Sequence, residues 1–493
     1  MRHEGKTEVM PGEPANALPA SRNGPDDVDA ASAQSFPASD PPPWTLGTES
    51  PDEYRIEHDS MGEVRVPVDA LYGAQTRRAV ENFPIGSHRL QPEFIQAVAL
   101  IKACAARTNG KLGAIKPALA QAIEKAAEDI AGGLYADQFP VGIFQTGSGT
   151  STNMNVNEVI AHLTGAHPND QVNRNQSSND VIPSAIHIAA AVQIHAQLLP
   201  ALECLRQALE SKAAEFRDVS KIGRTHLQDA TPMTLGQEFG GYAHQVRASA
   251  ERVTAALDGL YELPLGGTAI GTGVNLSPGF AAQTIELISR RTGVPFREAS
   301  NHFEAQAAKD AVLFMSGALR SCAVALIKIA NDIRWLASGP RGGIGEIHLP
   351  ELQPGSSIMP GKVNPVIAES VLMVCAQVIG HDAAIAWSCA AGNFELNTMM
   401  PLIAFDLLDS IEILSAGSRN FAVRCIADLT ADAARAGALV EQSSAMATLL
   451  TPEIGYDKAA AIVKEALAKG RTVREVAIEK SGLSRDEIDR LLS

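Results

Sequence analysis

Four polar, glycine-rich segments of the sequence carry the residue types that chemistry on a small anion requires. They are 146–155 (TGSGTSTNMN), 176–180 (QSSND), 223–229 (GRTHLQD) and 354–365 (PGSSIMPGKVNP). Their hydroxyl and carboxamide groups are hydrogen-bond donors suited to carboxylate oxygens. Glycines beside helix starts also leave backbone N–H groups free to bind anions. We therefore expect these segments to bind a small carboxylate.

Three side chains in these segments can do more than bind. His226 carries an imidazole, the group that most readily takes and gives protons near neutral pH. Ser356 lies between Gly355 and Ser357, and it can act as a nucleophile or, once deprotonated, as a base. Lys362 supplies a positive point charge. Each residue alone also fits a cap, a turn or a solvated charge, so the hypothesis of catalysis depends on their combination.

Long helices are predicted to position these segments. A spacing of four and three runs from residue 315 to residue 336, which is typical of the seam of a helical bundle. This seam consists of Met315, Leu319, Cys322, Leu326, Ile329, Ile333 and Leu336. Further long helices are expected at 186–216, with a kink at Pro200, and at 235–261, 365–390 and 397–427. Helices of about 40 Å present more apolar surface than one subunit covers easily, so we expect an oligomer with a shared bundle.

Composition limits the class of protein. The chain has 493 residues and a formal net charge of −15, which argues against nucleic acid or an anionic membrane as the main partner. No uninterrupted apolar run reaches the ~18 residues that span a bilayer. Six isolated cysteines form no C-x-x-C pair, which favours buried thiols in a reducing cytoplasm. Motifs for a P-loop, a dinucleotide fold and a zinc protease are also missing from the sequence.

The N-terminal region differs in texture from the rest. Residues 1–53 hold nine of the 28 prolines among Ala, Ser, Asp and Gly, a composition that predicts a disordered leader. The leader is acidic and has no basic start followed by an apolar segment, so neither a secretory signal nor a mitochondrial transit peptide is expected. The next segment, 54–66, alternates enough to suggest a small hairpin.

The 354–365 motif resembles the signature of the fumarase/aspartase superfamily. Matching motifs occur in the same order along nearly the whole chain after the leader, at 59–62, 71–76, 146–150, 176–180, 223–232 and 338–341. Segments 265–273, 301–306, 392–397 and 455–460 are more similar to the class II fumarases than to the aspartases. The resemblance implies a mainly α, three-domain fold with a central long-helix bundle that assembles into a homotetramer. The implied parts are the leader 1–53, an N-terminal domain 54–176, a helical domain 177–430 and a small C-terminal helical domain 431–493.

The resemblance also assigns roles to residues. Ser356 would be the base that removes the C3 proton of malate, and the loop from Gly355 to Lys362 would close over the substrate. His226, paired with Glu369, would handle the water or hydroxyl group. The implied substrate-binding residues are Ser148, Gly149, Thr150, Ser177, Ser178, Asn179, Thr225, Ser357, Lys362, Val363 and Asn364. An accessory anion site would comprise His167, Pro168, Asn169 and Asp170. Three subunits would contribute to each active site, with no metal and no cofactor.

Physical chemistry agrees with these residue types. Removing a proton from a carbon next to a carboxylate creates an aci-carboxylate with a second negative charge. General acid–base catalysis supplies roughly 10²–10⁴-fold, so preorganised donors and cations must stabilise that charge. The predicted reaction is the interconversion of L-malate and fumarate. The alternatives are an aspartate ammonia-lyase that uses the same serine, and a catalytically silent helical scaffold.

Overall fold

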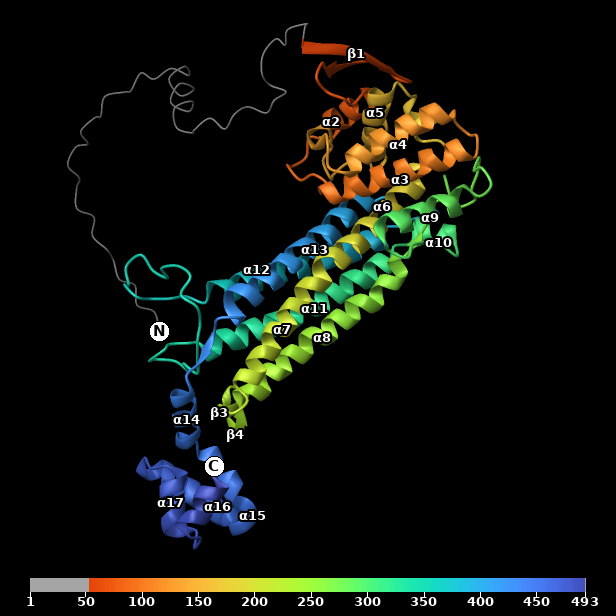
Figure 1. The fold of residues 1–493 in the computed structure, drawn as a ribbon. Coiled ribbons are helices and arrows are strands. Elements are labelled where there is room, and N and C mark those ends of the chain that lie inside the picture. The colour runs from red at the N-terminus through yellow and green to blue at the C-terminus, as the bar shows by residue number, and fades with distance from the viewer. Residues whose placement is uncertain (1–52, 493) are drawn as a thin grey trace, which may run out of the picture. The chain divides into compact units, whose positions relative to one another are not determined.

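The computed structural model describes residues 53–492 of the chain (Figure 1). The predicted leader therefore lies outside the described residues, apart from Glu53. The described part is mainly α-helical, as predicted, and its strands form only two-stranded sheets. Residues 55–493 form one compact unit.

The region before the bundle begins with the predicted hairpin, β1 (Tyr54–Asp59) and β2 (Gly62–Pro67). Four helices follow: α2 (Ala74–Asn82), α3 (Pro92–Lys111), α4 (Pro117–Ala131) and α5 (Thr150–Thr164). Helices α3 and α4 both begin with proline, whose fixed φ and missing N–H suit the first helical position. A 3-10 turn, Ala136–Gln138, lies between α4 and α5.

Long helices form the central bundle, in which α7, α8, α11, α12 and α13 run side by side (Figure 1). The bundle helices are α6 (Ser178–Gln193), α7 (Leu199–Glu215), α8 (Leu235–Leu260), α11 (Asp310–Leu336), α12 (Val366–Ala390) and α13 (Met400–Phe421). All seven residues of the predicted seam between 315 and 336 are buried, which confirms the bundle register. The helices predicted near 235–261, 365–390 and 397–427 are present as well.

The predicted kink at Pro200 takes the form of a change in helix type. A π-helical segment, Ile194–Leu198, separates α6 from α7, and Pro200 lies at the start of α7. Proline has no N–H to donate to the preceding turn, so the regular α-helical hydrogen-bonding pattern is interrupted here. A second π-helical segment, Ala422–Ile426, follows α13.

Short elements connect the bundle helices. Strands β3 (Ser220–Thr225) and β4 (Gln228–Thr234) form an antiparallel hairpin between α7 and α8. Strands β5 (Glu262–Leu263) and β6 (Arg297–Glu298) pair in parallel, and α9 (Phe280–Thr292) lies between them in sequence. Helix α10 (His302–Ala307) precedes α11, and β7 (Ile347–His348) pairs with β8 (Thr430–Ala431).

The C-terminal region has a hydrophobic core of its own. Its helices are α14 (Ala433–Gln442), α15 (Thr451–Ile454), α16 (Tyr456–Lys469), α17 (Val473–Lys480) and α18 (Arg485–Leu491), with a 3-10 segment at Ser444–Leu450. Ile222 of β3 is buried in this second core together with Val476 and Ile488. The separate core supports our proposal of a C-terminal domain over 431–493.

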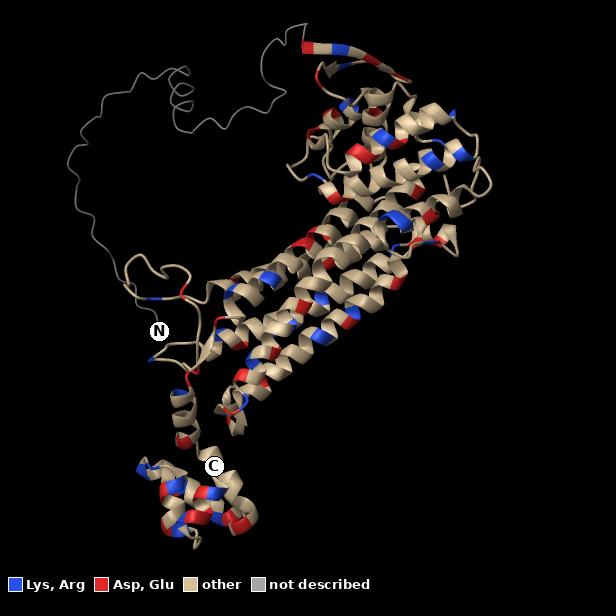
Figure 2. Ribbon diagram, viewed as in Figure 1, with Lys and Arg blue, Asp and Glu red and all other residues tan. Residues whose placement is uncertain are grey.

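The bundle helices carry charged residues of both signs (Figure 2), and three helical stretches are strongly apolar. Acidic and basic residues are interspersed along the described helices rather than gathered on one basic face (Figure 2). Three helical stretches, Ser178–Glu215, Asp310–Leu336 and Val366–Ala390, are nevertheless long and apolar enough to cross a bilayer by length and composition.

All six cysteines lie within the described residues as free thiols. Four of them are buried and two are partly buried.

Candidate active site

The first group of predicted binding residues lies at the start of α5. Gly147 is required there because a Cβ would lie 1.8 Å from the carbonyl oxygen of Thr398. Gly149 precedes the helix with φ 72°, a left-handed conformation that favours glycine. The hydroxyl groups of Ser148 and Thr150 are 2.8 Å apart. The cap residue Gly149 offers no side chain, and the N–H of Thr152 in the first turn of α5 donates to Oε1 of Gln145 at 3.0 Å. The N–H groups that precede Thr152 can therefore receive a carboxylate.

The second group lies at the start of α6, directly beside the first. Ser177 caps α6, and its Oγ accepts the N–H of Asn179 at 3.2 Å. Asn153 of α5 donates from Nδ2 to the Oγ of Ser178 at 2.9 Å, which joins the two helix starts. Asn179 donates from Nδ2 to the carbonyl oxygen of Ala269 at 2.8 Å. The structure therefore brings these predicted donors together and holds them in place.

Sequence reasoning missed two buried charges behind these donors. Asp180 is fully buried, and it accepts N–H bonds from Ser177 at 2.9 Å, Gly266 at 3.0 Å and Thr268 at 2.9 Å. Burial raises the pKa of Asp180 to about 6, and the three N–H bonds oppose this rise. The signal that could have found it is the capping box, in which a serine is followed three residues later by an acid.

Lys102 is the second buried charge. Its Nζ donates to Oδ1 of Asn173 at 2.8 Å, and burial lowers the pKa of Lys102 to about 7. In the sequence it interrupts the apolar run of α3, which is the pattern of a lysine that points into a core. Lys102 and Asp180 attract each other electrostatically, so they support the α5–α6 end from inside the protein.

Two hydrogen bonds join the two ends of the loop that carries Ser356. The N–H of Gly355 donates to the carbonyl oxygen of Lys362 at 2.8 Å, and Asn364 donates from Nδ2 to the carbonyl oxygen of Gly355 at 2.7 Å. A Cβ at Gly355 would lie 2.4 Å from the carbonyl oxygen of Lys362, so the close approach requires glycine. The Oγ of Ser356 accepts the N–H groups of Ile358 at 3.3 Å and Met359 at 3.1 Å.

A cavity of about 760 Å³ lies beside this loop at the start of α12. Among the residues that line it are Lys362, Val363, Asn364, Glu369, Arg334 and His348. Four predicted site residues thus share one cavity, whereas Ser356 and His226 are not part of its lining. Ser357, Lys362 and Val363 are exposed.

His226 occupies the turn of the β3–β4 hairpin. His226 and Leu227 have φ values of 57° and 61°, and Thr225 pairs with Gln228 on either side of them. Two central residues with positive φ define a type I′ turn, the two-residue connection that suits the twist of a hairpin. Thr225 and His226 are exposed. Among the described residues, no hydrogen bond or ion pair joins His226 to Glu369, so one chain does not form the predicted pair.

The donor cluster and the acid–base residues lie at opposite ends of the bundle. The helical stretch Ser178–Glu215 has 38 residues, or about 57 Å at roughly 1.5 Å per residue, and it separates Asn179 from the His226 hairpin. Helix α12 has 25 residues, or about 37 Å, and it separates Lys362 from the segment that contacts Gly147. One chain therefore cannot place both groups around one small substrate.

The predicted accessory residues lie close to the donor cluster. The N–H of Asp170 donates to Nδ1 of His167 at 3.1 Å, which starts the π-helical segment Pro168–Val172. Asn169, Asp170 and Ser177 line a cavity of about 350 Å³. The structure therefore joins part of the accessory set to the start of α6, while the His167 side chain is largely exposed.

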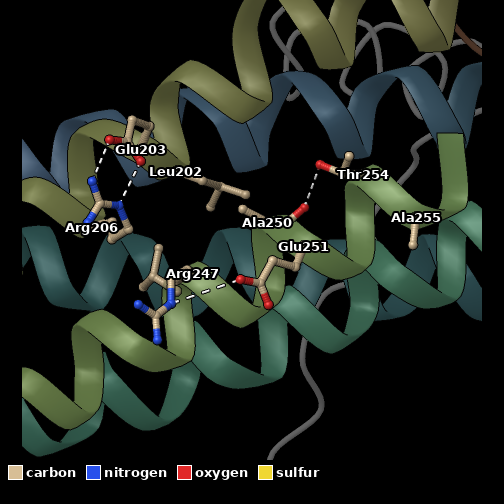
Figure 3. Close-up of a pocket in the computed structure, with 9 residues that line it drawn as sticks. Leu202, Glu203, Arg206, Arg247, Ala250, Glu251, Thr254 and Ala255 are labelled. Carbon is tan, nitrogen blue, oxygen red and sulfur yellow. Dashed lines mark hydrogen bonds and ion pairs between the residues drawn. The ribbon is translucent and has the colours of Figure 1, made fainter.

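Another cavity, of about 520 Å³, lies between α7 and α8 and contains no predicted site residue. Its charged side chains pair with one another along the rim, Glu203 with Arg206 and Arg247 with Glu251 (Figure 3). They are therefore not aimed at a ligand. Within residues 53–492, no group of three or more His, Cys, Asp or Glu side chains is placed to hold a metal ion.

Comparisons with known proteins identify the family of the chain. The lyase family model matches residues 62–380, and the model described as the fumarase C C-terminus matches residues 446–493. The chain is 53% identical over 449 residues to "Fumarate hydratase class II" of Mycobacterium tuberculosis, a match that covers 89% of this chain and 95% of that protein. It is 50% identical over 447 residues to the protein of the same name from Xylella fastidiosa, covering 90% and 94%.

Solved structures give the same result. Class II fumarase from Schistosoma mansoni matches with a TM-score of 0.86 at 39% identity, covering 89% of this chain and 98% of that one. A fumarate lyase from Brucella melitensis matches with a TM-score of 0.85 at 45% identity, covering 89% and 98%. The fold and these matches thus define a lyase built on a long-helix bundle. Within that class, the chain belongs to the class II fumarate hydratase family, which confirms the resemblance read from its motifs.

Proposed function

We propose that this chain catalyses the reversible interconversion of L-malate and fumarate plus water, with Ser356 as the base that removes the C3 proton. The observation that carries the mechanism is the hydrogen bonding of Ser356. Its Oγ accepts the backbone N–H groups of Ile358 and Met359, and donors aimed at a hydroxyl oxygen favour its deprotonated form. Family membership supports the substrate and the reaction.

Lys362 and Asn364 stabilise the aci-carboxylate that proton removal creates. Enzymes lower barriers by about 8–23 kcal/mol, of which acid–base catalysis supplies roughly 3–5 kcal/mol. Electrostatic stabilisation of the new charge supplies much of the remainder. The hydrogen bond from Asn364 to Gly355 fixes the loop that places Lys362 beside the cavity. His226, with Glu369, protonates the leaving hydroxyl group or activates the water in the reverse direction.

The active site is assembled from several subunits of a homotetramer. The donor cluster at the starts of α5 and α6 lies a bundle length away from Ser356 and His226, so neighbouring chains must bring the groups together. Helix α12 supports this assembly, because only 33% of its most apolar stretch is buried within the chain. Trp387 and Met373 on α12 are 81% and 68% exposed, and such apolar surface marks a protein interface.

The remaining assignments follow from the sequence and the site. We place the enzyme in the cytoplasm, with a dicarboxylate as substrate, no cofactor or metal, and neither nucleic acid nor membrane as partner. The segment His167–Asp170 serves as an accessory anion site, which the shared cavity with Ser177 supports. Its ligand would be a second dicarboxylate.

An absorbance assay at the fumarate band tests the proposed function with the purified full chain. We expect absorbance to grow when L-malate is added and to remain flat with L-aspartate. Growth with aspartate alone would identify an ammonia-lyase. No growth with either substrate would support the silent scaffold and overturn the proposal.

A further inference from the structure

A buried ionic cluster lies at the base of the hairpin that carries His226. Glu346 is fully buried, although carboxylates are rarely excluded from water without a partner. Its Oε1 and Oε2 accept hydrogen bonds from Nη2 and Nη1 of Arg224 at 2.7 and 3.1 Å, so the pair is bidentate. The Nζ of Lys221 lies 3.5 Å from the same carboxylate.

Lys221 extends this cluster to the bundle. It is almost fully buried, and its Nζ lies 2.9 Å from Oε2 of Glu238 on α8. Residues three apart point to opposite faces of a regular strand, yet both Lys221 and Arg224 reach Glu346. The strand pairing is irregular at this point, because the register shifts between Ile222 and Arg224. The shape of the hairpin is thus tied to the buried carboxylate.

The backbone of Glu346 is itself fixed from two sides. Its N–H donates to the carbonyl oxygen of Leu336 at the end of α11 at 2.8 Å, and its carbonyl oxygen accepts the N–H of Asp432 at 2.9 Å. The next residue, Ile347, pairs with Ala431 in the β7–β8 sheet. The Glu346 side chain therefore extends from a rigid anchor to the hairpin.

The position of this cluster relates it to catalysis rather than to stability alone. Arg224 is two residues before His226, and the His226 turn itself is exposed. The hairpin is packed at its base, through Ile222 in the C-terminal core and through the ion pairs of Lys221 and Arg224. An error of about 1 Å in the position of a catalytic group can cost roughly 10²-fold in rate.

We infer that Glu346 is a positioning residue for His226: its bidentate pair with Arg224 fixes the β3–β4 turn at the place where the imidazole meets the substrate. This inference rests on the proposed role of His226. Replacing Glu346 with glutamine removes the negative charge that faces the partly buried Arg224 and the buried Lys221. The hairpin then shifts, and the imidazole loses its alignment.

A double-mutant cycle on the full chain tests this inference with malate as substrate. We expect Glu346→Gln to lower kcat about tenfold to a hundredfold with little change in KM. In a His226→Asn background the same change should lower kcat less than twofold, because a residue that acts through His226 has no further effect once His226 is gone. An equal loss of kcat in both backgrounds would overturn the inference.

The matched control is Asp382→Asn. Asp382 is another buried carboxylate, bonded to Ser316 at 2.7 Å and to Arg320 at 2.6 Å, and it lies within the bundle. Its loss should lower Tm without lowering kcat. If Glu346→Gln behaves in the same way, the cluster is structural and the inference fails.

Arg224→Lys keeps the test decisive if Glu346→Gln does not fold. This variant preserves the charge but removes the bidentate fork. We expect kcat to fall about tenfold, and an unchanged kcat would overturn the inference. A wild-type chain that shows no hydratase activity would instead refute the proposed function, so the two failures are distinguishable.

Discussion

At the α5–α6 end of the bundle the predicted binding groups bond to other groups of the same chain, whereas Thr225, His226 and Lys362 at the other end are exposed. Two buried charges, Lys102 and Asp180, support the first end from behind. We propose that the chain preorganises its binding half by itself, whereas neighbouring subunits and loop closure complete its acid–base half.

The largest effect is expected from the exposed half. Ser356→Ala removes the proposed base, so kcat should fall by at least 10²-fold while the fold persists, because a loop hydroxyl contributes little packing. Turnover of malate and the circular dichroism spectrum measure both properties. Ser484→Ala serves as the control: it removes the N-cap of α18 in the C-terminal region and should affect only stability. Retention of more than about a tenth of wild-type kcat would exclude Ser356 as the base.

The next effect concerns the hairpin turn. His226→Asn keeps a residue that tolerates positive φ but removes the proton-transfer group, so kcat should fall about 10²-fold with KM nearly unchanged. Steady-state kinetics over a range of malate concentrations separates the two parameters. An increase in KM alone would assign His226 to binding and would weaken the contrast between the two ends.

A smaller effect is expected at the α5–α6 end, where the binding groups bond to other groups of the same chain. Asp180→Asn places an amide where the carboxylate accepts three N–H groups, so the starts of α5 and α6 should loosen. We expect KM for malate to rise about tenfold and Tm to fall, because one lost buried acceptor costs about 1–3 kcal/mol. Asp258→Asn, at an exposed ion pair with Arg297, is the control. An unchanged KM would show that this end is not preorganised by Asp180.

The smallest expected effect is on the pH dependence of the free energy of unfolding. Burial lowers the pKa of His187 on α6 to about 4, and its Nδ1 contacts the carbonyl oxygen of Glu262 at 2.7 Å. The unfolded chain binds this proton near pH 6.5 and the folded chain does not, so stability falls as pH falls from about 6.5 to 4. In His187→Gln the slope should decrease by up to about 1.4 kcal/mol per pH unit. Urea unfolding at several pH values measures the slope, and equal slopes would contradict the prediction.

Much of the fold was predictable because the relevant signals are local. The seam from Met315 to Leu336 repeats every three or four residues, and a repeat of that kind specifies a helix and its buried face without reference to the rest of the chain. The Ser177 and Ser356 motifs were recognisable for the same reason. The sequence also predicted Pro200 as an irregular point, although the π-helical form of the interruption was not foreseen.

The sequence by itself determined the helical bundle and the family, and it supplied the prediction of the donors and the base. Only the tertiary structure decided that Asp180 accepts N–H groups from Gly266 and Thr268, that Glu346 bonds to Arg224, and that the donors lie a bundle length from His226. These contacts join residues about 80 to 120 positions apart in sequence. Hydrophobic periodicity describes neighbours within a helix, whereas buried charges find their partners through long-range packing, and no local pattern records that choice.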